Sequence, residues 1–107
     1  METIKLYYQD AFMRQFDATV LACTADKKEW DVVLDRTAFY PEGGGQAADT
    51  GTLGTVRVLH TREDGEEIIH LCDEPLTVGT TVEGEIDWEA LRVRDLDRAA
   101  DGMDFEY

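Results

Sequence analysis

The stretch Thr37-Ala38-Phe39-Tyr40-Pro41-Glu42-Gly43-Gly44-Gly45-Gln46 decides how the surrounding chain folds. A short apolar run, residues 30–34, leads into this glycine loop, and a second run, residues 49–53, leaves it. Proline fixes its own φ and holds the preceding residue extended, so we expect the extended chain that follows this first run to end at Tyr40. Glycine lacks a Cβ and lets another backbone, a side chain or a ligand come close. The stretch is therefore either a wide β-turn with a bulge or a contact site for a second surface.

The glycines of this loop do not match a nucleotide-binding loop. Phosphate and dinucleotide fingerprints have other spacings and need a helix after the last glycine, and no helical pattern follows Gly45. Gln46 adds an amide that both donates and accepts hydrogen bonds at the end of the loop. We therefore take Gly43, Gly44, Gly45 and Gln46 as candidate contact residues.

The chain is strongly acidic. Its 107 residues carry a formal net charge of −14, and its ten lysines and arginines are scattered rather than clustered. Such a surface repels phosphate backbones and acidic membranes, and it favours solubility or docking against a basic surface. We find no signal peptide and no membrane-spanning apolar run, and we expect a cytoplasmic protein with no membrane partner. In that compartment Cys23 and Cys72 should be reduced thiols.

The hydrophobic pattern is that of short β-strands separated by turns. Turn signals recur roughly every 8–12 residues, which is typical of a small barrel or sandwich. We predict an all-β domain over residues 1–89, folded as a small closed or partly open barrel. From Glu89 the composition becomes helical, so residues 90–107 are expected to form a short C-terminal helix or a fraying tail. The expected strands cover residues 5–8, 16–24, 30–34, 52–53, 56–61, 67–72 and 82–88.

Local patterns predict further details of this domain. Strict alternation over residues 16–24 would place Ala18, Val20 and Ala22 on one face of a strand. Residues 62–66 have the composition of a hairpin turn.

Residues suited to metal binding or catalysis are sparse. His60, His70 and Cys72 are the nearest approach to a zinc site, but structural sites use four nitrogen or sulfur ligands and catalytic sites use three plus water. We expect ordinary strand positions, with His70 and Cys72 on one face and Leu71 on the other, and a metal site is the alternative. The chain contains no serine, which excludes a serine nucleophile. Asp49, beside the glycine loop, is expected on the solvated surface.

Thr37 has two interpretations. Its hydroxyl can satisfy the neighbouring backbone, which is the ordinary role of threonine at a strand end. It can instead point into a cleft and meet a hydroxyl of a ligand. A buried polar group left unpaired costs on the order of 1–3 kcal/mol, so one hydroxyl in a cleft can discriminate between small substrates.

Four segments of the sequence occur, in this order, in a known family. They read KLYYQDAF (residues 5–12), LDRTAFYPEGGGQ (34–46), DTGTL (49–53) and EIDWE (85–89). Over about residues 3–89 the chain resembles the N-terminal glycine-rich domain of AlaX-type alanyl-tRNA editing proteins, which is related to the editing region of alanyl-tRNA synthetase. The Phe-Tyr-Pro-x-Gly-Gly-Gly-Gln run is the specific part of this resemblance.

The resemblance implies a β-barrel of the translation-factor type that packs against a larger, zinc-binding α/β domain. Together the two domains would hydrolyse seryl- or glycyl-tRNA(Ala). The resemblance places Thr37 near the aminoacyl pocket. It places Gly43, Gly44, Gly45 and Gln46 toward the catalytic domain or the tRNA.

The zinc-binding part of the family pattern does not follow in this sequence. In the family, Ile-Asp-Trp leads into a helix with a His-x-x-x-His pair, whereas residues 89–96 contain no histidine. We therefore expect an accessory barrel that shapes the aminoacyl pocket, binds no zinc or other cofactor, and hydrolyses nothing alone. Its expected partners are a zinc-bearing catalytic domain or subunit, tRNA(Ala) through the complete protein, and a second copy of the chain. The alternatives are a non-catalytic protein-interaction module and a fragment of an alanyl-tRNA synthetase-related protein.

Overall fold

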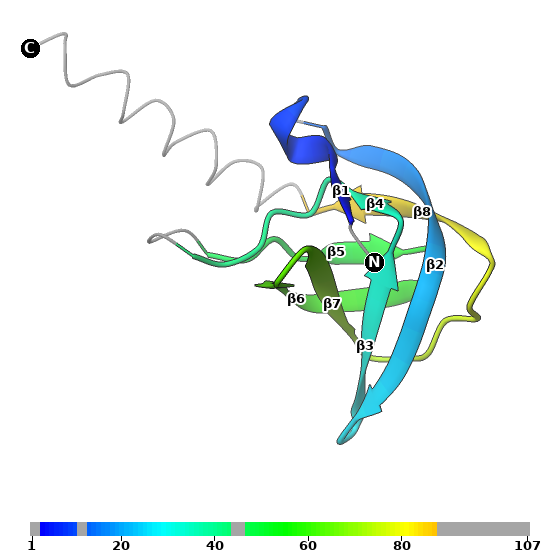
Figure 1. The fold of residues 1–107 in the computed structure, drawn as a ribbon. Coiled ribbons are helices and arrows are strands. Elements are labelled where there is room, and N and C mark those ends of the chain that lie inside the picture. Colours follow the sequence, from blue (N-terminus) through cyan, green and yellow to red (C-terminus); the bar gives the residue numbers. More distant parts are fainter. Residues whose placement is uncertain (1–2, 11–12, 44–46, 88–107) are drawn as a thin grey trace, which may run out of the picture.

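The computed structural model describes residues 3–10, 13–43 and 47–87 and is an all-β structure (Figure 1). The predictions for Gly44, Gly45, Gln46 and residues 90–107 therefore concern residues outside the described ranges. The elements are β1 (Ile4–Lys5), the 3₁₀ turn η1 (Leu6–Tyr8), β2 (Gln15–Asp26), β3 (Glu29–Leu34), β4 (Arg36–Thr37), β5 (Gly51–Leu53), β6 (Val56–Asp64), β7 (Glu67–Cys72) and β8 (Thr81–Ile86).

Within these residues, six strands pair in a ring to form a closed barrel in the order β2-β3-β7-β6-β5-β8. Every pair around the ring is antiparallel, and β8 closes the ring by pairing with both β2 and β5. β1 and β4 form a separate parallel pair beside the barrel. The all-β prediction is confirmed. No helix in the described ranges is long and apolar enough to cross a membrane.

The core fills the inside of the barrel and includes the start of the glycine loop. Phe39 has no exposed surface, and its ring meets those of Phe16 and His70 edge-on at centroid distances of 5.8 and 5.4 Å. Edge-to-face contacts of this kind stabilise a core beyond the area that they bury. The chain therefore enters the glycine loop from a fixed point inside the barrel.

Two glycines allow close packing in the barrel wall. A Cβ on Gly84 would lie 2.5 Å from Cζ of Phe16, so the ring occupies the space that a side chain would need. A Cβ on Gly51 would overlap the carbonyl oxygen of Glu85 and lie 3.0 Å from Cα of Ile86. β5 and β8 can approach this closely only because residue 51 has no side chain.

A bulge in β2 overturns one expectation. The register of β2 against β3 shifts between Val20 and Ala22, so Ala22 pairs with Val33 and Cys23 pairs with Val32. A bulge moves every following residue to the other face of its strand. Cys23, not Ala22, therefore packs against the core with Val20.

The expected strand over residues 5–8 was wrong in part. β1 ends at Lys5 and the 3₁₀ turn η1 follows, closed by the Gln9 N–H, which donates to Leu6 O at 2.9 Å. Leu6 and Tyr7 are both buried. Consecutive side chains of a strand point to opposite faces of a sheet. A tight 3₁₀ turn lets the neighbouring side chains of Leu6 and Tyr7 both be buried.

The expected turn over residues 62–66 is shorter than predicted. β6 continues to Asp64, and the turn is at Gly65, whose φ is +63°. Arg62 is held in the strand by Asp31 of β3, with Nη2 and Oδ2 2.9 Å apart. The charged residues mark the outer face of a strand and not its end.

Candidate functional site

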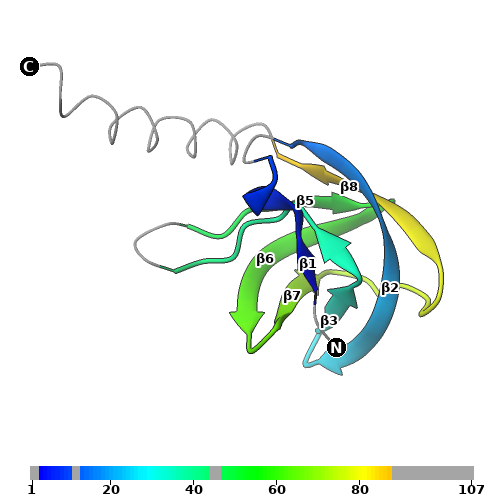
Figure 2. The same cartoon turned by 45° about the horizontal axis from the view of Figure 1, so that its top comes forward.

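The glycine loop leaves the barrel as two adjacent limbs, residues 40–43 and 47–50 (Figures 1 and 2). The Tyr40 N–H donates to Asp49 Oδ2 at 2.8 Å, and the Asp49 N–H donates to Tyr40 O at 2.9 Å. Asp49 is only 2% exposed, so its expected place on the solvated surface was wrong. Its carboxylate satisfies a backbone N–H and fixes the base of the loop.

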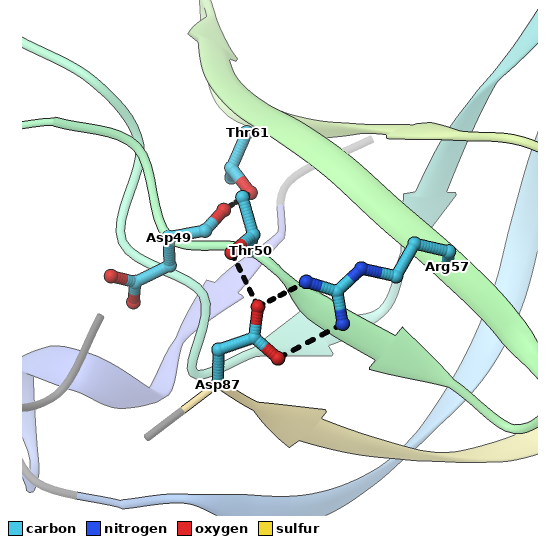
Figure 3. A network of polar contacts seen from close by, with 5 residues as sticks. All are labelled: Asp49, Thr50, Arg57, Thr61 and Asp87. Carbon is cyan, nitrogen blue, oxygen red and sulfur yellow. Dashed lines mark hydrogen bonds and ion pairs between the residues drawn. The ribbon is translucent and has the colours of Figure 1, made fainter. Parts of the chain in front are cut away.

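Strand β6 holds both limbs against the barrel. The Glu42 N–H donates to Thr61 O at 3.1 Å, and the Thr61 hydroxyl donates to Asp49 O at 2.9 Å (Figure 3). Thr61 has no exposed surface. A hydroxyl is tolerated at this buried position because it satisfies a carbonyl of the departing limb.

Asp87 anchors the second limb from the end of β8 (Figure 3). It accepts a hydrogen bond from the Thr50 hydroxyl at 2.6 Å, and Arg57 Nη1 donates to its Oδ1 at 2.9 Å. Arg57 Nη2 also contacts Oδ2, which makes the pair bidentate. The Arg57 guanidinium lowers the pKa of Asp87, and the hydrogen bond from Thr50 adds to this effect. The exit of the loop is thereby tied to β6 and β8.

We predict that Asp87→Asn will lower the free energy of unfolding at pH 7 by about 1 kcal/mol, because the pair is partly exposed and screened. The folded pKa of Asp87 lies below its usual value, so the contribution is present above that value and is lost as the pH falls through the folded pKa. Urea unfolding at pH 7 and at pH 3 measures this, and the difference in unfolding free energy between the two proteins should be smaller at pH 3 than at pH 7. Glu83→Gln, a change of the same charge on the exposed part of β8, is the control. Equal losses in both variants would contradict a local role.

Thr37, His70 and Val32 form a buried hydrogen-bonded chain. The Phe39 N–H donates to Thr37 Oγ1 at 3.0 Å, Thr37 Oγ1 and His70 Nε2 are 2.8 Å apart, and His70 Nδ1 is 3.0 Å from Val32 O. A carbonyl only accepts, so Nδ1 carries the proton and the Thr37 hydroxyl donates to Nε2. Burial lowers the pKa of His70 to about 4, which keeps the imidazole neutral. The chain links β3, β4 and β7 at the entry to the glycine loop.

This geometry gives Thr37 the local role among its two interpretations. Its side chain has no exposed surface, and its hydroxyl is engaged by Phe39 and His70. The expectation that Thr37 faces a substrate therefore finds no open cleft at this residue. Thr37 instead positions the residues that start the glycine loop.

Gly43, at the end of the first limb, is exposed and has a φ of +152°. Other residues rarely adopt this backbone conformation, and an added Cβ would meet no atom within 4 Å. A glycine is thus needed here because of the backbone conformation, and not because neighbouring atoms would clash with a side chain. Of the four loop residues that we singled out, Gly43 is the one that the structure describes.

The histidines and cysteines occupy strand positions. His70 and Cys72 are both buried and Leu71 is half-buried, as the alternation predicted. A register shift between Val58 and His60 places His60 opposite Leu71, and its Nε2 lies 2.8 Å from Glu42 Oε1. Among the described residues, no three histidine, cysteine or acidic side chains are grouped to hold a metal ion.

The buried thiol of Cys72 is not activated. Cys23 and Cys72 are free, and burial raises the pKa of Cys72 to about 12. The thiolate is the nucleophilic form, so Cys72 is inert at neutral pH. What the described site provides is a loop fixed at both ends and presented outside the barrel.

Sequence comparison places the chain in a known family. The model of the family described as tRNA synthetases class II (A) matches residues 3–90. The chain belongs to this family. It is similar to alanine–tRNA ligases: 48% identical over 94 residues to that of Thermococcus kodakarensis, 49% over 94 residues to that of Pyrococcus furiosus, and 43% over 91 residues to that of Ignicoccus hospitalis.

These matches cover 81–82% of this chain and 10% of each ligase. The chain therefore spans about a tenth of the length of the relatives it matches. It is related to alanyl-tRNA synthetases through one segment.

Proposed function

We propose that this chain is an accessory barrel of an alanyl-tRNA editing system, in which it helps to form the aminoacyl pocket of a zinc-bearing hydrolytic domain. The single observation that supports this most strongly is the 94-residue match, 48% identical, to a segment of an alanine–tRNA ligase. The reaction that the resemblance implies is hydrolysis of seryl- or glycyl-tRNA(Ala). The zinc ion would be supplied by the other domain and would activate water there.

The geometry supports a role for the loop more than for the barrel interior. Asp49, Thr61 and Asp87 fix the two limbs, and Thr37 with His70 fixes the entry from inside the barrel. Limbs held in this way lose little conformational freedom when a second surface binds. In this proposal Thr37 acts on the pocket indirectly, by setting the path of the backbone that leads to Gly43.

A non-catalytic protein-interaction module is the second candidate, and the formal net charge of −14 favours it. An acidic surface is suited to docking on a basic protein and unsuited to binding tRNA directly. Pull-down from the source organism with and without RNase separates the two proposals. A zinc-bearing editing partner supports the first, and an unrelated partner that survives RNase supports the second.

We expect the purified chain to leave seryl-tRNA(Ala) intact and to accelerate its hydrolysis when a separate zinc-bearing editing domain is added. Gly43→Ala should reduce this acceleration, because alanine disfavours a φ of +152° and redirects the loop. The measurement is the release of labelled serine over time, with the chain, the zinc domain and both together.

Gly79→Ala is the matched control for this assay. Gly79 also has a positive φ, +91°, and an added Cβ there would meet no atom within 4 Å, but it lies in the loop between β7 and β8. Both variants should lose similar stability, and only Gly43→Ala should lose acceleration. Serine release by the chain alone, or equal losses of acceleration in the two variants, would overturn the proposal.

A further inference from the structure

A cleft of about 290 Å³ lies beside the first limb of the glycine loop. Its walls come from the 3₁₀ turn η1, from the first limb and from β6. The side chains that matter here are three aromatic rings and two carboxylates, those of Tyr7, Tyr8, Tyr40, Glu42 and Glu63. These residues define an acidic tyrosine cleft, which is separate from the proposed editing function.

The three rings form a row in which the middle ring, that of Tyr7, is the buried one. Tyr7 is 4% exposed and lies between the other two, with ring centroids 4.8 Å from Tyr8 and 4.6 Å from Tyr40. Tyr8 is 74% exposed. A tyrosine that is already packed on a buried ring offers a large contact face and loses little side-chain entropy on binding. The row is therefore a preformed surface on which a flat group can stack.

The negative charges of the cleft favour a positively charged group over a negatively charged one. The carboxylates of Glu42 and Glu63 are 58% and 49% exposed, and the chain as a whole is strongly acidic. His60 lies 2.8 Å from Glu42, and the Lys5 ammonium lies 3.7 Å from Glu63, beyond direct hydrogen-bond distance. An anion would be repelled from this site, whereas a cation would meet both the carboxylates and the negative faces of the rings.

We propose that the acidic tyrosine cleft binds an arginine side chain of a partner protein. The guanidinium group is planar, stacks on aromatic rings and donates two parallel hydrogen bonds to a carboxylate. Here it would stack on Tyr8 or Tyr40 and take the place of Lys5 at Glu63. A nucleobase could stack on the same rings, but its phosphates would face Glu42, Glu63 and the acidic surface around them.

The test is titration of the ¹⁵N-labelled chain with a blocked Gly-Arg-Gly tripeptide, followed by amide shifts in NMR spectra. The neutral probe Gly-citrulline-Gly has the same shape, and adenosine monophosphate represents a nucleic-acid ligand. We expect saturable shifts at Tyr8, Tyr40 and Glu63, and binding of the arginine peptide about threefold or more tighter than that of the citrulline peptide. Equal binding of citrulline, or tighter binding of adenosine monophosphate, would overturn the proposal.

Three substitutions separate the cleft from the general acidity of the surface. Glu63→Gln should weaken arginine binding about threefold, and Glu83→Gln, the same charge change outside the cleft, should leave it unchanged. Lys5→Met should strengthen binding because it removes the competing ammonium group. Arginine shifts that respond alike to Glu63→Gln and Glu83→Gln would mean nonspecific attraction and would contradict a built site.

Discussion

Alanine at position 51 is expected to destabilise the barrel by about 3 kcal/mol, the upper end of what overpacking costs. The added Cβ would overlap the carbonyl oxygen of Glu85 and come within 3.0 Å of Cα of Ile86. Gly51 pairs with Val58 on one side and with Ile86 on the other, so the backbone cannot shift away without breaking a ladder. A loss of this size corresponds to a fall in the melting temperature on the order of 15 °C for a domain of this length.

Gly54→Ala is the control for this substitution. Gly54 has a φ of +63°, and an added Cβ there would meet no atom within 4 Å, so alanine should cost only about 1 kcal/mol of backbone strain. Thermal and urea unfolding of both variants measure the difference. Similar losses for Gly51→Ala and Gly54→Ala would contradict the close approach of β5 and β8 that we describe.

Acidification from pH 6.5 to pH 4 is expected to cost the fold about 3 kcal/mol through His70 alone. Burial lowers the folded pKa of His70 to about 4 from an ordinary value of 6.5. The unfolded chain therefore binds a proton in this range and the folded chain does not, so stability falls as the pH falls. The main cause is burial, which disfavours the charged imidazolium. In addition, a protonated Nε2 could no longer accept the hydrogen bond from the Thr37 hydroxyl.

Urea unfolding of the wild type and of His70→Gln across this pH range measures the effect. The acidic side chains titrate in both proteins, so the difference between the two curves isolates the histidine. We expect the difference in unfolding free energy between the two proteins to shrink by about 3 kcal/mol from pH 6.5 to pH 4. A constant difference would contradict a buried, neutral His70.

A second measurement covers the case in which His70→Gln does not fold. The imidazole ¹⁵N shifts of the wild-type chain should report the Nδ1–H tautomer, with the proton held by Val32 O. They should not change with pH until the fold itself begins to open. Titration of His70 in the folded chain near its ordinary value would contradict the assignment.

The fold could be predicted from the sequence where strands are short and bounded by turns. The run 67–72 and the run 30–34 were predicted within one residue of β7 and β3. The faces of β2 and β6 were harder, because each strand contains a bulge. Strict alternation after Val58 points His60 inward, but the register shift there places Thr61 inside the barrel. A bulge depends on the partner strand, which a local pattern does not contain.

In the candidate site, too, features set by the local sequence could be predicted and features set by distant partners could not. Proline and glycine identified the loop, because their backbone preferences act locally. Asp49, Thr61 and Asp87 gave no comparable signal, since their partners lie on other strands. Thr37 was found for its position before the aromatic residues, but its burial depends on His70, 33 residues away. Polar residues that brace a loop become recognisable only when the barrel brings them together.

The order of strands in the ring also has a consequence for synthesis of the chain. β8 pairs with both β2 and β5, and Asp87 at its end braces the second limb of the loop. A nascent chain that has not yet released residues 81–87 from the ribosome would carry two open strand edges and an unbraced loop. Open edges recruit other chains, so stalling before this point should favour aggregation.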